Sequence, residues 1–156
     1  MMAEIKRDAA GTPLVQVSVR SSRGMDTVAV TVNDCEKENI TVQMESLIRG
    51  KESPDTVCTA LPADLRAIKE LCSDPVLFAE VEEEPFPGIY VEDGNSVSIQ
   101  IFGKDKDADF SFLNLWSYEN CLDDAPQTKR LYQIAEKVLK AASKASGKKL
   151  KLDMFT

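Results

Sequence analysis

The sequence predicts an α+β protein in which two helices pack on one face of a mainly antiparallel sheet. Short runs that alternate apolar and polar residues occur in two regions, 15–44 and 89–116, and such alternation is typical of half-buried strands. Two other segments, 63–72 and 125–145, repeat apolar residues at helical spacing. The strand runs fall into two meanders, so we expect about five to seven strands in one sheet.

Length and composition fit one folded unit. The chain has 156 residues, of which 43% are hydrophobic and 29% charged, as in an ordinary globular domain. A domain of this size buries about 70% of the surface of its unfolded chain. We therefore expect a single domain over 1–156, in which 1–11 form a flexible polar lead-in.

The first meander is predicted from three alternating runs. Valine occupies every second position at 15–19 and again at 28–32, and the loop residues 21–24 lie between these runs. This arrangement predicts an antiparallel hairpin. The run at 40–44 predicts a third strand, although 42–48 also fits a short helix.

The central helix is expected over 63–72. Pro62 lies just before it, at a position compatible with a first helical turn, and Pro75 ends it because proline disfavours helix in the residue before it. The stripe that would face the core is Leu65, Ile68, Leu71 and Cys72.

The second meander should contain three strands, at 89–91, 97–101 and 110–116. Asp93 and Gly94 mark a tight turn between the first two strands, because glycine accepts the positive φ that such turns need. In the last strand we expect Phe110, Phe112, Asn114 and Trp116 to face one way.

The C-terminal helix, at 125–145, has the clearest pattern. Asp124 is placed to cap its N-terminus while Gln127 reaches back, as in a capping box, and Gly147 is placed to end it. Residues 149–155 form either an edge strand or a tail. The expected core stripe is Leu131, Ile134, Ala135, Val138, Leu139 and Ala142.

Several chemistries are excluded by residue type. The chain has no histidine, which excludes Ser-His-Asp and Cys-His catalysis, histidine-ligated zinc and an imidazole general base. The four cysteines, Cys35, Cys58, Cys72 and Cys121, have neither metal-ligand nor redox spacing, so we expect free and mostly buried thiols. The alternative is a Cys58–Cys72 disulfide, which requires an oxidising compartment.

Charge is distributed unevenly along the chain. Residues 80–124 contain twelve acidic and two basic side chains, whereas 125–156 contain eight basic and two acidic ones. Such imbalance attracts partners of opposite sign and speeds encounter. The lysines from 137 to 151 are expected on a solvated helix face, or in ion pairs with the acidic segment. Direct nucleic-acid binding is not expected, because the −10 segment repels a polyanion.

The acidic segment supplies the candidate binding residues. Its carboxylates would steer a basic partner, and its tyrosines would provide anchoring contacts. We expect the first, third and fifth residues of the run 80–84 to share one strand face, and Tyr118 to be exposed because polar residues flank it. The partner-binding residues are therefore Glu80, Glu82, Glu83, Glu84, Tyr90, Asp105, Asp107, Asp109 and Tyr118.

No catalytic, metal or cofactor site is expected. Asp105, Asp107 and Asp109 have the one-three-five spacing of a calcium loop, but Phe110 and Trp116 stand where an EF-hand needs glycine and glutamate. The chain also lacks the glycine-rich loop that cradles phosphates.

In charge and size the chain resembles small acidic immunity or inhibitor proteins of bacteria, which neutralise a basic toxin enzyme. The resemblance involves no motif. It implies a non-catalytic protein that presents 80–124 to a basic protein partner. A cytoplasmic location is expected, since neither a secretory leader nor a membrane-spanning run is predicted. The alternatives are a carboxylate-based, metal-dependent hydrolase and a nucleic-acid mimic or subunit of a larger assembly. The sequence is compatible with a monomer and with a homo-oligomer.

Overall fold

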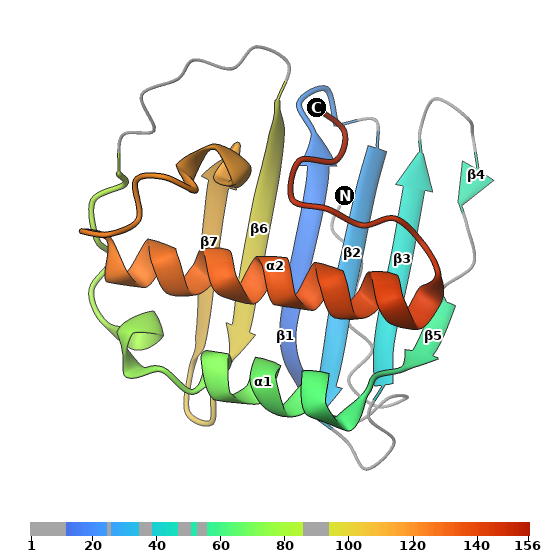
Figure 1. Cartoon of the computed structure of the whole chain (residues 1–156), viewed down its shortest axis with the longest axis horizontal. Helices are drawn as coiled ribbons and strands as arrows, with labels where there is room; N and C mark the ends of the chain where they lie inside the picture. The colour runs from blue at the N-terminus through green and yellow to red at the C-terminus, as the bar shows by residue number, and fades with distance from the viewer. Residues whose placement is uncertain (1–11, 25, 35–38, 47–50, 53–55, 86–93) are drawn as a thin grey trace.

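One antiparallel sheet carries two α-helices on a single face (Figure 1). The structure is a computed structural model of the whole chain. It describes residues 12–24, 26–34, 39–46, 51–52, 56–85 and 94–156. The α+β class and the placement of both helices on one face are thus confirmed.

Seven strands and two α-helices lie within the described residues, with two short 3-10 helices between them. The strands are β1 (Thr12–Ser21), β2 (Asp26–Asp34), β3 (Asn39–Ser46), β4 (Lys51–Glu52), β5 (Thr56–Thr59), β6 (Asn95–Phe102) and β7 (Asp107–Leu113). The helices are α1 (Pro62–Cys72), η1 (Pro75–Phe78), η2 (Leu115–Tyr118) and α2 (Pro126–Ser146).

The strands follow the order β4-β3-β2-β1-β6-β7, and every pairing is antiparallel. The strands β4 and β5 both pair with β3 on the side away from β2. The strand β5 pairs with residues 39–42 of β3, and β4 pairs with residues 45–46. The chain leaves this edge through α1 and later returns in β6, beside β1. The first strand of the protein therefore lies at the middle of the sheet and joins the two meanders.

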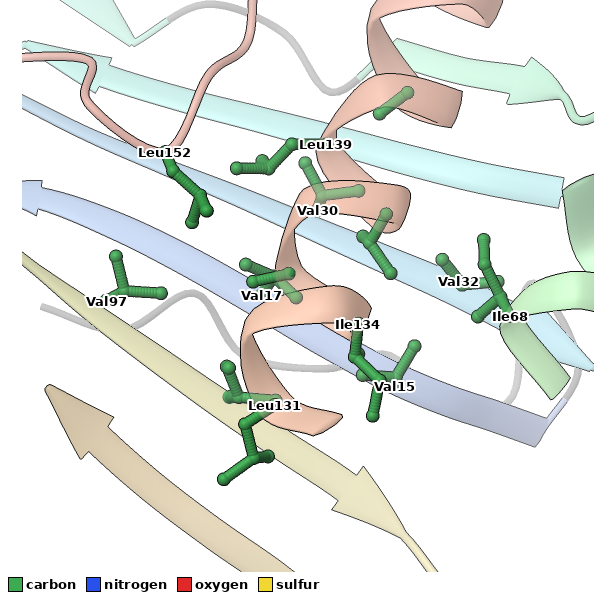
Figure 2. Packing of buried hydrophobic residues seen from close by; sticks show 14 of the residues in the cluster. Val15, Val17, Val30, Val32, Ile68, Val97, Leu131, Ile134, Leu139 and Leu152 are labelled. Carbon is green, nitrogen blue, oxygen red and sulfur yellow. The ribbon is translucent and has the colours of Figure 1, made fainter. Parts of the chain in front are cut away.

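The register aligns apolar side chains in rows across the central strands. Val17 lies opposite Val30 of β2 on one side and Ile99 of β6 on the other, and the neighbouring rows repeat this pattern. These side chains are fully or almost fully buried. Figure 2 shows Val17 and Val30 beneath α2, on the side to which Leu131, Ile134 and Leu139 point. Complete burial of one such side chain stabilises the fold by about 1.5–3 kcal/mol.

The two α-helices begin and end close to the predicted positions. Proline occupies the first turn of each helix, where the missing N–H has no partner to lose. The helix α2 ends at Gly147, whose φ of 74° lies in the left-handed region that favours glycine. All the residues of its predicted core stripe are buried.

Several predicted boundaries were wrong for local reasons. The strand predicted over 110–116 ends at Leu113, because Asn114 adopts a left-handed conformation with a φ of 53°. Trp116 consequently lies in η2 and not in a strand. The segment 80–84 also forms no strand, so its alternate glutamates do not share a strand face. The strand predicted at 89–91 lies outside the described residues.

The C-terminal residues form a tail over the sheet, on the same face as α2 (Figure 1). Leu150 and Leu152 are buried in the core. The Asn95 side-chain amide donates to the carbonyl oxygens of Leu152 and Met154, each at 2.8 Å. Ser143 fixes the start of the tail, since its hydroxyl donates to the Leu150 carbonyl and accepts from the Leu150 N–H. Of the two predicted alternatives, the tail is the one observed.

Candidate functional site

The charge asymmetry of the sequence becomes a charge asymmetry in space. The helix α2 crosses the strands, so that it begins beside β7 and ends beside β3 (Figure 1). The acidic segments that flank η1, η2 and β7 lie at the first of these ends. Lys148, which follows α2, lies at the other end, with Nζ 3.7 Å from Met44 Sδ of β3. Exposed carboxylates therefore predominate at the end beside β7, where Lys104, Lys106 and Lys129 are also exposed.

We call the exposed carboxylates near β7 the acidic end. It consists of Glu80, Glu83, Glu84, Asp105, Asp107, Asp109, Glu119, Asp123 and Asp124. The turn at the start of β7 lies against the segment before Glu80, because the ring of Phe78 in η1 occupies the space that a side chain at Gly103 would need. This contact brings two distant parts of the sequence to one side of the fold.

The three predicted aspartates are exposed. Asp105 lies in the turn between β6 and β7. Asp107 and Asp109 lie on β7, opposite Phe102 and Gln100 of β6. In β7 the side chains of Phe110 and Phe112 face the helices, so the alternate aspartates face away from them. Within the described residues β7 is the last strand in the sheet order, so Asp107 and Asp109 lie on an edge strand.

Of the four predicted glutamates, two have structural roles. The Glu82 carboxylate accepts a hydrogen bond of 2.6 Å from the Thr128 N–H, in the first turn of α2. Glu84 accepts one of 3.3 Å from the hydroxyl group of Tyr118. Glu80 and Glu83 are exposed. The predicted capping box is wrong, because the N-cap residue is Ala125 and the capping carboxylate comes from Glu82.

The predicted anchoring role of Tyr118 is not supported by its position. The side chain is buried, with 5% of its surface exposed, and packs edge-on against Phe112 with ring centroids 6.3 Å apart. Burial, followed by the nearby Glu84 carboxylate, raises the pKa of Tyr118. The prediction that Tyr118 is exposed was therefore wrong. The other predicted tyrosine, Tyr90, lies outside the described residues.

Gln127 holds the acidic segment against α2. Only 3% of its surface is exposed. Its amide nitrogen donates to the Val76 carbonyl at 2.9 Å, and its amide oxygen accepts from the Glu82 N–H at 3.2 Å. The same glutamine thus binds η1 and the segment that follows, and places the neighbouring glutamates at the surface.

A surface groove of about 530 Å³ runs between α2, η2 and the tail. This aromatic groove was not predicted from the sequence. It has two aromatic side chains, Trp116 and Tyr132, and three carboxylates that come from three different elements. The residues that line it are Trp116, Glu119, Tyr132, Glu136, Leu139, Lys140, Ser143, Leu150, Lys151, Leu152 and Asp153.

The pKa of the Tyr132 phenol reflects the burial and the charges around it in the groove. Burial raises its pKa, and the carboxylates of Glu136, Glu119 and Asp153 raise it further, in that order. Both Lys140 and Lys151 also line the groove, so its charged groups are three acidic and two basic. The carboxylates thus outnumber the lysines in the groove, and they raise the pKa of the Tyr132 phenol.

A sequence signal for this groove exists beside the core stripe of α2. Tyr132, Glu136, Leu139, Lys140 and Ser143 recur at helical spacing, one position after the residues that face the sheet. Such a stripe borders the core, and its members range from buried Leu139 to exposed Glu136 and Lys140. The sequence alone does not show that η2 and the tail pack beside it and make a groove.

The lysines of α2 were expected in solvent or paired with the acidic segment. Lys137 instead binds Asp64 of α1, with Nζ and Oδ1 2.9 Å apart, and Lys144 Nζ lies 3.8 Å from Oδ2 of the same carboxylate. Asp64 is 7% exposed. The side-chain hydrogen bond from Lys137 lowers the pKa of Asp64 despite its burial, and the charges of both lysines lower it further. This ion pair joins the two α-helices.

The described cysteines are free thiols, so a Cys58–Cys72 disulfide is not formed. Cys72 is buried, whereas Cys58 and Cys121 are partly exposed. In the described part of the chain, no three histidine, cysteine or acidic side chains are grouped to hold a metal ion. No described helix is long and apolar enough to cross a membrane.

Comparison with known proteins gives no family for the chain. No protein-family model matches it, and no curated protein matches it with significant similarity.

Proposed function

We propose that this protein is a non-catalytic binding protein whose acidic end docks on a basic protein partner. The observation that supports the proposal is the excess of exposed carboxylates over exposed lysines at the end of the molecule beside β7. A partner with a basic surface would be drawn to one end of the molecule and turned toward it. A toxin enzyme neutralised by an immunity-type protein is a partner of this kind.

The carboxylates would act mainly on the rate of encounter. Exposed charges contribute little to the affinity of a formed complex, because water and salt screen them. Buried aromatic contacts supply most of the binding energy in protein interfaces. The aromatic groove borders the acidic end through Glu119, which belongs to both, and it offers Trp116 and Tyr132 for such contacts. The two features together would give steering and anchoring.

Capture from a lysate of the source organism tests the proposal when two baits are compared. One bait is the wild-type protein, and the other carries Glu80→Gln, Glu83→Gln, Asp105→Asn and Asp109→Asn, which remove four exposed carboxylates from the acidic end. At about 50 mM salt, we expect the wild-type bait to retain a basic protein. The neutralised bait should retain much less of the same protein.

The interface is then mapped on the isolated complex by hydrogen exchange. Protection should occur in 80–85, in β7 and in η2. Equal capture by both baits, or protection confined to the β3 end of the sheet, would contradict the proposal. The variant Lys149→Gln serves as the matched control, because it alters an exposed charge at the other end of the molecule and should leave capture unchanged.

A further inference from the structure

We propose that the aromatic groove receives an arginine side chain of the basic partner, with its guanidinium group against Trp116 and Tyr132 and beside the carboxylates of Glu119, Glu136 and Asp153. This inference rests on the proposed function, since it names the chemical group that the partner would insert. It concerns a groove that shares Glu119 with the acidic end and is otherwise made of other residues.

The dimensions and lining of the groove suit one side chain. A volume of about 530 Å³ lies within the range of sites that bind small ligands or anchoring residues. Leu139, Leu150 and Leu152 supply an apolar floor, on which the methylene groups of a long side chain can lie. The charged groups would then meet the head of that side chain.

The electrostatics select a cation. The carboxylates belong to Glu119 just after η2, to Glu136 of α2 and to Asp153 of the tail, and all three line the groove with Tyr132. Aromatic rings attract a cation placed over their faces, and this attraction adds to that of the carboxylates. Lys140 and Lys151 also line the groove and reduce its net negative charge, which favours a single inserted cation over a highly charged ligand.

Arginine fits these groups better than lysine does. Its planar guanidinium group stacks on aromatic rings, and it donates two parallel hydrogen bonds to one carboxylate. The groove therefore suits an arginine side chain better than a lysine side chain.

The test uses the fluorescence of Trp116, which is the single tryptophan of the chain. The purified protein is titrated with N-acetyl-arginine N-methylamide, and in parallel with the citrulline analogue, which has nearly the same shape but no charge. We expect a saturable change in Trp116 emission with the arginine probe, and binding at least five-fold weaker with citrulline. The lysine analogue should bind with intermediate affinity.

Three variants locate the binding site. Glu136→Gln and Asp153→Asn should each weaken binding of the arginine probe about three-fold, since each removes a carboxylate from the groove. Glu83→Gln removes a carboxylate that does not line the groove, and it should leave binding unchanged. Thermal melting of each variant verifies that it is folded.

Each outcome bears on one proposal. Equal binding of arginine and citrulline, or no saturable change in emission, would overturn the arginine site. If the captured partner still binds in a salt-dependent manner while the groove variants have no effect on it, the docking proposal stands and the groove inference fails. If the arginine probe binds as expected but no basic partner is captured, the groove inference stands and the docking proposal fails.

Discussion

Glu82 caps the C-terminal helix from 46 positions earlier in the chain, because its carboxylate accepts a hydrogen bond of 2.6 Å from the Thr128 N–H. The first N–H groups of a helix have no partner within the helix, and a carboxylate there also interacts favourably with the helix dipole. This contact fixes the acidic segment against α2. A residue that was predicted to bind a partner is therefore also part of the folded structure.

Removal of this cap should destabilise the protein. We expect Glu82→Ala to lower the free energy of unfolding by about 1 kcal/mol, which is a decrease in Tm of about 2–4 °C for a chain of this size. Urea and thermal denaturation measure the change. Glu82→Gln retains a side-chain oxygen that can accept the hydrogen bond, so it should lower the free energy of unfolding by less than Glu82→Ala does. A similar loss from Glu83→Ala, at the exposed neighbouring position, would show that the hydrogen bond to Thr128 is not the cause.

Gln127 should be sensitive to loss of its amide donor. In Gln127→Glu the new carboxylate cannot donate to the Val76 carbonyl, which now accepts a bond of 2.9 Å from this side chain. We expect a loss of about 2 kcal/mol in the free energy of unfolding, partly offset by a favourable charge in the first helical turn. Gln133→Glu is the matched control, because that exposed side chain accepts a hydrogen bond from Arg130 and remains an acceptor after substitution. Equal losses in both variants would contradict the account.

The Asp64 ion pair should make stability depend on pH. The pKa of Asp64 is lowered in the folded protein, chiefly by the hydrogen bond from Lys137. A lowered pKa means that the ionised form stabilises the fold above the unfolded pKa, which is about 3.9, and that this contribution is lost as the pH falls through the folded value.

We therefore expect Asp64→Asn to be less stable than the wild type by about 2 kcal/mol at pH 7, with a difference that narrows below about pH 4. Urea denaturation at several pH values from 7 to 3 measures the difference. Asp105→Asn is the control, because that exposed side chain lies in the turn before β7 and should show no such dependence. A constant difference across the pH range would contradict the proposed ion pair.

Cys72 should be unreactive while the protein is folded. Burial raises the pKa of its thiol to about 12, so that at pH 8 only about one molecule in ten thousand carries the reactive thiolate. Alkylation for a short time at pH 8, followed by mass spectrometry of the peptides, should label Cys58 and Cys121 well before Cys72. Labelling of all three at one rate in the absence of denaturant would contradict this burial. Urea should make the three rates equal.

The elements that local patterns define were predictable, and their boundaries less so. Alternating valines predicted β1 and β2, and helical spacing predicted α1 and α2 to within a residue or two at each end. The strand β5 was missed because Thr56–Thr59 is short and closely follows Pro54 in the sequence. The early end of β7 depends on the left-handed conformation of Asn114, which asparagine tolerates but does not require.

The candidate site depended on contacts that no local pattern reveals. The exposed positions of Asp105 and Asp109 could be predicted, because hairpin turns and edge strands leave charged side chains in solvent. The burial of Tyr118 could not, since it arises from Phe112 and Glu84. The aromatic groove needs the tail to pack beside η2, and this follows from hydrogen bonds that Asn95 makes across the fold.

The rate at which the captured partner associates, measured by stopped flow against ionic strength, tests the central claim most directly. With the wild type we expect the association rate constant to fall at least ten-fold between about 20 and 300 mM salt. With Glu80, Glu83, Asp105 and Asp109 neutralised, the rate should be lower at 20 mM and nearly independent of salt. A wild-type rate constant that stays the same across this range would contradict docking through the acidic end.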